Sequence, residues 1–415
     1  MWKAVTSGEW MARRRSELAS VRPVVDEIIA QVRERGDAAL VDLTRKFDGV
    51  TLDRLQVSEE EREAAYDQVD RRLLEALLES EARISRFHEL QLPRDLWLAQ
   101  VEPGITLGVK TAPLARVGAY IPGGRAAYPS TALMCAIPAR VAGVGSLCCC
   151  SPPPIPPLSL VAMDIAGYDE IFKIGGAQAI AAMAIGTESV RAVDKIVGPG
   201  NVYVTMAKML LRDRAEIDFP AGPSEILVIA DETARPEFIA ADILAQAEHD
   251  PGAACLLITP DASLPARVGA SLELQVKDAA RKEVIREAME HSGFLVVDTL
   301  GRAVEEANRA APEHLSLQVR DPMEILPEIT HAGSIFIGPY AAVACGDYAS
   351  GTNHVLPTAG YAGVYSGLDV GHFLTRSSVQ IISREGLEAI GDTIEALAEA
   401  EGLEAHARSI HLRRT

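Results

Sequence analysis

Residues 226–259 read ILVIADETARPEFIAADILAQAEHDPGAACLLIT. Two short aliphatic runs, 226–230 and 255–259, flank a segment with helical periodicity that begins near Pro236 and stops at Asp250-Pro251-Gly252. Proline is tolerated in the first turn of a helix, and a Pro-Gly pair ends one. A strand, a helix and a second strand in this order form the βαβ unit of a parallel sheet, because parallel neighbours need a crossover connection. The stretch therefore predicts an α/β fold.

The same alternation recurs on both sides of this stretch. Downstream we expect a helix near 280–291 and a strand over 294–297. Upstream, a first series of β-rich runs follows residue 114 and is separated by helical patterns and Gly-rich turns. Its runs are 117–121, the residues that lead into Cys148-Cys149-Cys150, 179–184 and 195–197. Two series predict two Rossmann-like parallel-sheet domains.

Helical extensions are expected at both ends of the chain. The first ~100 residues consist mainly of long charged and apolar segments with helical periodicity. Near the C-terminus, Leu387, Ile390, Ile394 and Leu397 form a helical apolar stripe on an otherwise acidic segment. Such a stripe needs a partner surface to cover it.

Cysteines and prolines are crowded together in the first series, where residues 148–157 read CCCSPPPIPP. Adjacent cysteines suit neither a disulfide framework nor a metal knuckle, so we interpret them as small hydrophobes on a buried strand. Proline lacks the amide donor and fixes φ, so residues 150–157 are predicted to form a surface turn or loop.

Composition and charge limit the partners that the protein can have. The formal net charge is 40 − 58 = −18, which disfavours binding to a phosphate backbone, and Arg13-Arg14-Arg15 is the only short basic run. The apolar stretch 131–150 is interrupted by Pro138 and Arg140, and no apolar signal-peptide core follows Met1. We expect a cytoplasmic protein with no nucleic-acid partner and no membrane partner.

Polar side chains continue the apolar stripe of the helix that begins near Pro236. The stripe runs through Ile239 and Ile243, and helical spacing places Gln246 and then His249 on or beside the same face. An amide or imidazole next to a core must be hydrogen-bonded or metal-bound, because leaving it unpaired costs roughly 1–3 kcal/mol. The pair is therefore either a hydrogen-bonded core network or part of a metal site; zinc accepts imidazole readily, whereas glutamine is an unusual ligand.

A carboxylate and an imidazole are adjacent at Glu313-His314, directly after Pro312. They would supply two proton-transfer groups in one place, as successive oxidations of an alcohol and an aldehyde require. A dipeptide alone is also compatible with an accidental pair on the surface.

Two further segments contain possible ligands. Residues 346–354 form a predicted loop of small and polar residues in which Asp347 and His354 are plausible metal ligands, or an ordinary turn. Residues 401–406 read EGLEAH, and the glycine at 402 suggests a helix break that could redirect His406, although a histidine so near the end is normally solvated.

Glycine-rich turns occur at 121–124, 174–178 and 198–200. No strand is followed by G-x-G-x-x-G, and no G-x-x-x-x-G-K-[ST] occurs, so the standard Rossmann fingerprint and the P-loop are absent. Their absence argues against a conventional dinucleotide site. Backbone amides in such turns can still approach phosphates, so a site of another kind stays open.

Taken together, these segments resemble the histidinol dehydrogenase family along nearly the whole chain, in the family's order and at near-family spacing. The segments that carry the resemblance are YIPGG (120–124), GGAQAI (175–180), VGPGN (197–201), AGPSE (221–225), QAEH (246–249), APEHL (311–315), GDYASGTNH (346–354) and EGLEAH (401–406).

The resemblance implies one zinc ion per subunit of an intertwined homodimer. Its ligands would be Gln246, His249, Asp347 and His406, with His406 supplied by the other subunit, so that the C-terminal stripe packs on the partner. In the family the metal keeps positions for the substrate's imidazole and amino nitrogens, so it mainly orients substrate.

The resemblance also implies roles in catalysis and binding. His314 would be the base that removes the alcohol proton while hydride passes to NAD, and Glu313 would activate the water that adds to the aldehyde. The implied substrate contacts are Ser224, Gln246, His249, His314, Asp347, His354, Glu401 and His406. The implied cofactor contacts are Tyr120, Gln178 and Asn201.

From these segments we expect an N-terminal arm at 1–20, a metal and substrate domain at 21–118 and 223–365, a cofactor-binding domain at 119–222, and a dimerisation tail at 366–415. The expected activity is the NAD-dependent oxidation of histidinol to histidine. The alternatives are a related zinc and NAD dehydrogenase of another small alcohol, such as a sulfonated diol, a zinc hydrolase that uses Glu313 on a metal-bound water, and a catalytically silent metal-stabilised dimer.

Overall fold

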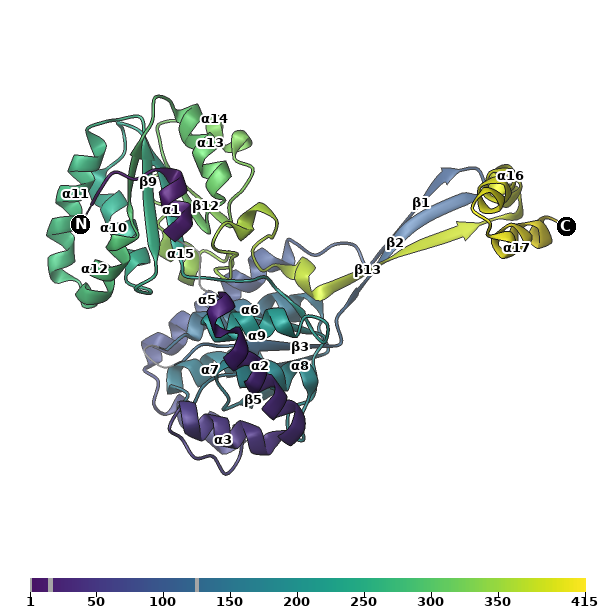
Figure 1. Ribbon diagram of the computed structural model, residues 1–415, viewed down its shortest axis with the longest axis horizontal. Coiled ribbons are helices and arrows are strands. Elements are labelled where there is room, and N and C mark those ends of the chain that lie inside the picture. The colour runs from purple at the N-terminus through teal and green to yellow at the C-terminus, as the bar shows by residue number, and fades with distance from the viewer. Residues whose placement is uncertain (1, 14–17, 124–126) are drawn as a thin grey trace. The chain divides into compact units, whose positions relative to one another are not determined.

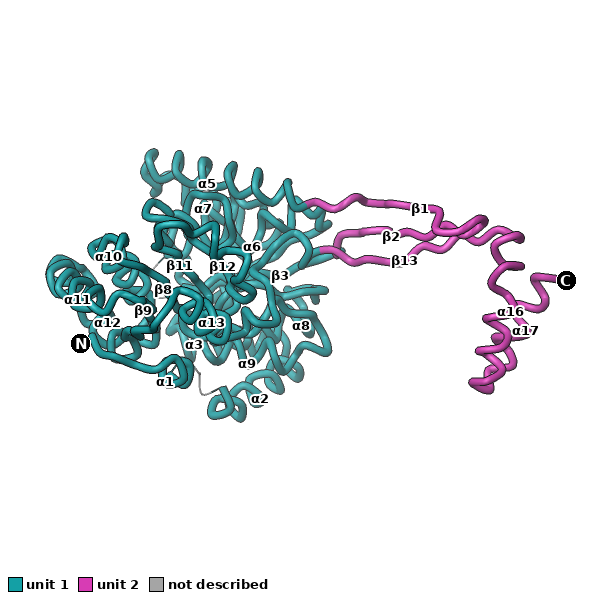
Figure 2. Tube along the Cα trace, turned by 90° about the horizontal axis from the view of Figure 1, so that it is seen from above, with its two compact units in different colours: residues 1–91, 115–373 teal, residues 92–114, 374–415 magenta. Residues whose placement is uncertain are grey.

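A computed structural model describes residues 2–13, 18–123 and 127–415 of the chain (Figure 1). The chain divides into two compact units, shown in different colours in Figure 2: unit 1 comprises residues 1–91 and 115–373, and unit 2 comprises residues 92–114 and 374–415. Unit 1 contains two five-stranded parallel sheets, which confirms the predicted pair of Rossmann-like folds. In the described part of the chain, no helix combines the length and apolarity needed to cross a bilayer.

The first sheet has the strand order β5-β4-β3-β6-β7. Its strands are β3 (Arg116–Tyr120), β4 (Ser146–Cys150), β5 (Glu170–Phe172), β6 (Lys195–Val197) and β7 (Glu216–Ile217). The helices between them are α6 (Pro129–Ala142), α7 (Pro157–Ala166), α8 (Gly176–Ile185) and α9 (Val202–Leu210). The chain builds outward from β3 to β5 and then returns to β6, so the order reverses between β3 and β6. Such a switch point is where parallel α/β sheets bind ligands, outside the carboxyl ends of the strands.

Two local predictions in this sheet need correction. Residues 179–184, expected as a β-rich run, lie inside helix α8, because their four alanines favour helix and Gly186 ends it. The Pro-rich segment does form a turn between β4 and α7, but Ser151 and Pro153 are buried, so it is not wholly on the surface. The cysteine triplet is fully buried in β4, as predicted.

The N-terminal helices pack on the first sheet. These are α2 (Leu18–Arg35), α3 (Asp37–Phe47), α4 (Glu59–Tyr66) and α5 (Arg71–Glu89). Val25, Ile28 and Val32 of α2 share one hydrophobic core with Ile180 of α8 and Val204 of α9. The expected grouping of residues 21–118 with 223–365 therefore differs from the packing, because these apolar faces are buried against the other sheet.

The second sheet has the strand order β10-β9-β8-β11-β12. Its strands are β8 (Glu225–Ala230), β9 (Ala254–Thr259), β10 (Gly293–Val296), β11 (His314–Gln318) and β12 (Ser334–Ile337). Its helices are α10 (Pro236–Ala247), α11 (Leu264–Gln275), α12 (Lys282–Glu290), α13 (Leu300–Ala310), α14 (Pro322–Ile325) and α15 (Val343–Tyr348). Residues 226–259 form β8, α10 and β9, which confirms the predicted strand, helix and strand.

The start of the chain covers the edge of this second sheet. Ala4 bridges to Phe294 of the edge strand β10, and Val5 donates its amide to the Phe294 carbonyl at 2.9 Å. Helix α1 (Ser7–Arg13) follows, and its Trp10 is completely buried. Pairing removes the row of open backbone groups that an edge strand otherwise exposes. Arg14 and Arg15, part of the basic run noted in the sequence, lie outside the described residues.

Unit 2 is a three-stranded antiparallel sheet followed by two helices. Strand β2 (Ile105–Pro113) lies between β1 (Leu96–Glu102) and β13 (Leu374–Ile382). Helices α16 (Arg384–Ala400) and α17 (Glu404–Arg414) form a hairpin in which Arg414 pairs with Asp392 at 2.7 Å. The apolar stripe predicted helix α16, but the sequence did not predict the sheet. Strand β13 is far from β1 and β2 in the sequence, so no local pattern reveals that it pairs with β2.

Candidate active site

Glu313 and His314 stand at the amino edge of the second sheet, where β11 begins beside β8. The backbone amide of Glu225 donates to Glu313 Oε2 at 2.7 Å, and the amide of Glu313 donates to Glu225 Oε1 at 3.1 Å. The side chains of Glu313 and His314 are each only 6% exposed. The surface-accident interpretation of this pair is therefore wrong, because an accidental pair would be solvated.

The ring of His314 is oriented by its Nδ1 atom. This atom lies 3.1 Å from the carbonyl oxygen of Glu225 and 3.4 Å from Glu313 Oε2. A carbonyl only accepts, so Nδ1 carries a proton, and when the ring is neutral its lone pair is on Nε2. Burial alone would lower the pKa of His314, but the charges of Glu313 and Asp347 and the hydrogen bonds to Glu313 and Glu225 outweigh it and raise the pKa to about 9.

Asp347 and His354 approach this pair from the segment after β12. Asp347 lies on the short helix α15, whereas the sequence predicted a loop, and His354 Nδ1 donates to the Asp347 carbonyl at 2.9 Å. Burial lowers the pKa of His354, and the charge of Asp347 partly opposes that shift. Because His354 also interacts electrostatically with His314 and Glu313, the structure brings these four side chains into one site.

Helix α10, which carries Gln246, packs on α15, the helix that carries Asp347. Gln246 is 2% exposed, and no hydrogen-bond partner for its Oε1 exists among the described residues. The sequence left open that Gln246 belongs to a hydrogen-bonded core network. Among the described residues, its amide oxygen forms no such network. His249 follows the end of α10 and is exposed.

The metal-ligand prediction can be compared with this geometry. Within residues 2–13, 18–123 and 127–415, no three His, Cys, Asp or Glu side chains gather as a metal site. The expected zinc ligands would not form such a group of three, because one of them is the amide of Gln246 and another, His406, belongs to unit 2. The buried, unpaired oxygen of Gln246 fits the donor that a metal ion would require.

The remaining expected substrate contacts occupy different surroundings. Ser224 directly precedes β8 and is half-buried. In unit 2, Glu401 caps the end of α16 and His406 lies in the first turn of α17, and both are exposed.

The carboxyl edge of the first sheet carries the residues expected to bind the cofactor. Tyr120 ends β3, and its hydroxyl accepts from the amide of Gly176 at 3.1 Å, at the start of α8. Gln178 is 1% exposed, and among the described residues its Oε1 has no partner. The residue before α8, Gly175, has no side chain that could cap the helix itself. A buried acceptor and a helix start at the carboxyl edge of a parallel sheet fit a dinucleotide.

The loop after β6 lies on the other side of the same switch point. Gly198 has φ 107°, and a Cβ there would lie 2.3 Å from the Tyr120 carbonyl oxygen, so only glycine fits. Its amide donates to Asp218 Oδ2 at 2.8 Å, and its carbonyl accepts from Lys208 Nζ at 3.0 Å. Asn201 caps α9 through its side-chain oxygen, a structural role that the sequence analysis did not foresee. Gly124, part of the Gly-rich turn after Tyr120, lies outside the described residues.

The corresponding edge of the second sheet is closed by the protein's own hydrogen bonds. Between the carboxyl ends of β8 and β11, the amide of Asp231 donates to the Gln318 carbonyl at 3.3 Å. The Asp231 carboxylate accepts from the Arg320 amide at 2.8 Å. The second sheet therefore presents its chemistry at the amino edge of its strands.

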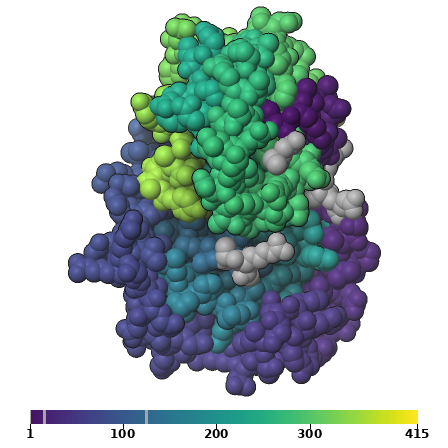
Figure 3. Space-filling view, turned by 90° about the vertical axis from the view of Figure 1, so that its left-hand side faces the viewer, coloured from purple at the N-terminus to yellow at the C-terminus, as the bar shows by residue number. Residues whose placement is uncertain are grey.

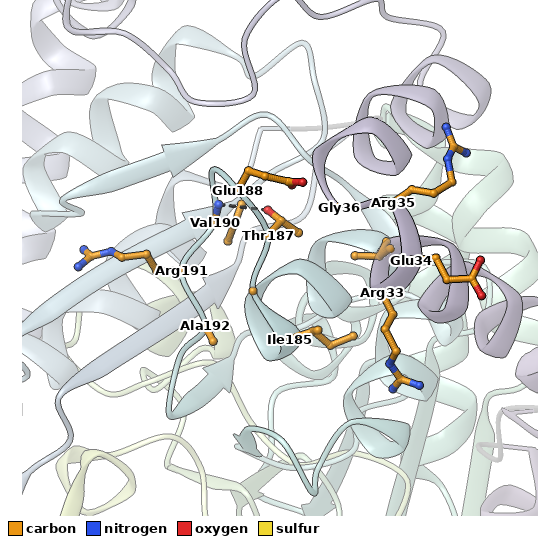
Figure 4. Close-up of a pocket in the computed structure, with 12 residues that line it drawn as sticks. Arg33, Glu34, Arg35, Gly36, Ile185, Thr187, Glu188, Val190, Arg191 and Ala192 are labelled. Carbon is orange, nitrogen blue, oxygen red and sulfur yellow. Dashed lines mark hydrogen bonds between the residues drawn. The ribbon is translucent and has the colours of Figure 1, made fainter.

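A shallow hollow elsewhere on unit 1 contains none of the candidate residues. It is lined by residues 32–36, at the end of α2, and by 185–188 and 190–192, after α8 (Figure 4). Within it the amide of Val190 donates to Thr187 Oγ1 at 3.2 Å. The candidate site is thus defined by its side chains and not by this hollow.

Sequence reasoning missed two residues that shape the site. Glu225 lies in the quoted segment 221–225, but its bonds to Glu313 depend on a strand pairing that no local pattern reveals. Asp242 of α10 accepts from the backbone amide of Val343, which begins α15, and is buried at 7% exposure. A charged residue on the buried face of an apolar helix was the available signal for Asp242.

Asp242 gives a prediction about stability and pH. Burial raises its pKa to about 6, against about 4 in an unfolded chain, so the folded state binds the proton more tightly. The associated stability is full below pH 4 and is lost as the pH rises through 6. For the metal-free protein at pH 7.5 we expect Asp242→Asn to be about 1–3 kcal/mol more stable than the parent, with little difference at pH 4.5. Urea unfolding at both pH values measures this, and a variant less stable at pH 7.5 would contradict it.

Two Rossmann-like sheets, a buried Glu-His pair, a buried amide oxygen with no partner among the described residues, and a switch point on the other sheet are features of an α/β enzyme of the dehydrogenase class. A family model described as histidinol dehydrogenase matches residues 11–414. The chain belongs to the histidinol dehydrogenase family.

Individual relatives agree with this assignment. The chain is 52% identical over 404 residues to the histidinol dehydrogenase of Methanosarcina mazei, covering 96% of this chain and 93% of that protein. It is 50% identical over 410 residues to that of Methanothermobacter thermautotrophicus, covering 98% and 96%. A crystal structure of histidinol dehydrogenase from Elizabethkingia anophelis matches with a TM-score of 0.93 and 37% identity, over 99% of this chain and 94% of that one.

Proposed function

We propose that this protein oxidises histidinol through histidinaldehyde to histidine, in the last steps of histidine biosynthesis, with NAD as hydride acceptor and one zinc ion per subunit. The observation that carries the proposal is the buried Glu313-His314 pair beside Asp347 and Gln246, in a chain of this family. The metal would be held by Gln246, His249 and Asp347, with His406 of a second subunit, and would orient the substrate's nitrogen atoms.

Each residue of the pair has a distinct task in this proposal. His314 accepts the hydroxyl proton on Nε2 as hydride leaves the carbinol carbon, and the Glu313 carboxylate stabilises the imidazolium that results. Glu313 then removes a proton from the water that adds to the aldehyde carbon, so that a second hydride can leave. Ser224, His354 and Glu401 contact the substrate in this arrangement.

The cofactor would occupy the carboxyl edge of the first sheet, within residues 119–222. Tyr120 and Gln178 line that edge, and Asn201 lies where β6 leads into α9. The closed edge of the second sheet supports this choice, because Asp231 already satisfies the backbone groups there. Residues 223–365 would then hold metal and substrate.

We also propose a homodimer in which unit 2 packs on a partner and supplies His406 and Glu401. Every residue of β1 is exposed, although the strand contains Leu96, Trp97 and Leu98. On the helices, Leu397 and Leu403 are exposed at 61% and 42%. Exposed apolar side chains gathered on one small unit mark an interaction surface. A cytoplasmic location fits an enzyme that depends on NAD.

Zinc content and NADH yield test the proposal together. We expect one zinc ion per chain and two NADH per histidinol consumed, measured by elemental analysis and by absorbance with histidine quantified as product. Activity on another small alcohol but not on histidinol would favour the related dehydrogenase. Turnover without nicotinamide would favour the hydrolase, and zinc binding without turnover the silent dimer; each of these results would overturn the main proposal.

A further inference from the structure

The segment that carries Asp347 and His354 follows the second sheet, but it is held by helices of the first. Ser80 Oγ of α5 donates to the backbone carbonyl of Tyr348, 268 positions away in sequence. Arg83 Nη1, one turn later on α5, lies 3.5 Å from the carbonyl oxygen of Ala349. Figure 3 shows the yellow-green segment after α15 adjoining the blue surface of the N-terminal helices.

Helix α6 holds the other end of the segment. Asn353 Nδ2 donates to the Met134 carbonyl at 2.8 Å, and Thr131 Oγ1 lies 3.3 Å from His354 Nε2. Between the two ends, a Cβ on Gly351 would lie 2.6 Å from the carbonyl oxygen of Arg83, so the backbones of segment and α5 are in direct contact. Residues 348–351 therefore contact α5, and residues 353 and 354 contact α6.

Ser80 links helix α5 to the backbone next to a proposed metal ligand. Its acceptor, the Tyr348 carbonyl, belongs to the last residue of α15 and directly follows Asp347. Carbonyls at the end of a helix have no partner within the helix, and Ser80 supplies one from a side chain that is 9% exposed. The bond ties the end of α15, one residue after Asp347, to helix α5.

We infer that Ser80 is a positioning residue for the metal site: through the Tyr348 carbonyl it holds Asp347 where the ion binds, so that metal affinity depends on a helix of the other sheet. The inference rests on the proposed zinc site. Groups that orient metal ligands typically contribute about 10–100-fold to metal affinity. Ser80→Ala should therefore raise the Kd for zinc by about tenfold or more.

The test measures zinc Kd by chelator competition on the purified full-length chain. Ser85→Ala is the matched control, because Ser85 is also on α5 but, among the described residues, its hydroxyl bonds to Glu81 of the same helix at 3.0 Å and to no other element. Ser80→Cys keeps the size and offers only a weak donor, so its Kd should lie between those of the parent and Ser80→Ala. This variant also serves if Ser80→Ala does not fold.

Affinity separates positioning from a general loss of stability. We expect saturating zinc to restore kcat in Ser80→Ala, whereas Ser85→Ala keeps the parent's Kd throughout. Unchanged zinc Kd in both Ser80 variants, with a parent that binds zinc, would overturn the inference and leave the proposed function standing. A parent chain that binds no zinc would overturn the proposed metal site and this inference with it.

Discussion

Replacing His249 by asparagine is expected to abolish bound zinc and to reduce histidinol oxidation by at least about 100-fold, which is the upper range for losing only a group that supports a ligand. His249 is exposed just after α10 and belongs to none of the hydrophobic cores formed by described residues, so its loss should not affect folding. Elemental analysis and initial rates of NADH formation measure the two effects, and the free energy of unfolding should stay within about 0.5 kcal/mol of the parent's metal-free value.

His291→Asn is the matched control for this experiment. His291 likewise follows the last residue of a helix, α12, of the second sheet. It should keep zinc and activity at the parent's level. Full activity of the metal-free His249→Asn protein would exclude the metal assignment.

Replacing Glu313 by glutamine should slow the oxidation of the aldehyde about 10²–10⁴-fold, the usual range for removing a general base. The oxidation of the alcohol should slow much less, because His314 Nε2 takes that proton. Glutamine keeps an oxygen that can accept from the Glu225 amide, so the local geometry is preserved. Single-turnover NADH formation, started once from histidinol and once from histidinaldehyde, separates the two steps.

A comparison with Glu225→Gln identifies the cause of any slowing. The Glu225 side chain accepts from the Glu313 amide through Oε1 and so holds the backbone of the pair, and its substitution should affect both oxidations alike. If Glu313→Gln slowed both steps equally, the proposed division of labour between Glu313 and His314 would be wrong.

Elements defined by local patterns could be predicted from the sequence. Strands β8 and β9 of the second sheet are almost continuously aliphatic, since they are buried on both faces, and α10 has Pro236 in its first turn. The prediction of a β-rich run at the alanine-rich residues 179–184 failed because an apolar run of that length suits either a buried strand or a buried helix. The prediction of which sheet α2–α5 pack on failed for a different reason. An amphipathic helix shows that one of its faces is buried, but it does not show which element covers that face.

The candidate site likewise contains residues that local patterns could predict and residues that they could not. Gln246 could be found because helical spacing placed a polar side chain on an apolar stripe, and its unpaired oxygen agrees with that prediction. Ser80 could not be found, since its partner is a backbone carbonyl on a distant helix. Glu225 and Glu313 bind each other only because β8 and β11 are paired in register. The chemistry is visible in residue types, whereas its positioning depends on tertiary contacts.

The sheet of unit 2 has a consequence for how the protein is made. Thr375 of β13 bonds to Ala112 of β2 across 263 positions, so the hairpin of β1 and β2 leaves the ribosome long before its third strand exists. At typical synthesis rates this interval is about 13–50 s. During it one side of β2 is an open strand edge, next to apolar side chains such as Trp97 and Leu98. We therefore expect this hairpin to be the part of the nascent chain most prone to pair with other chains until translation ends.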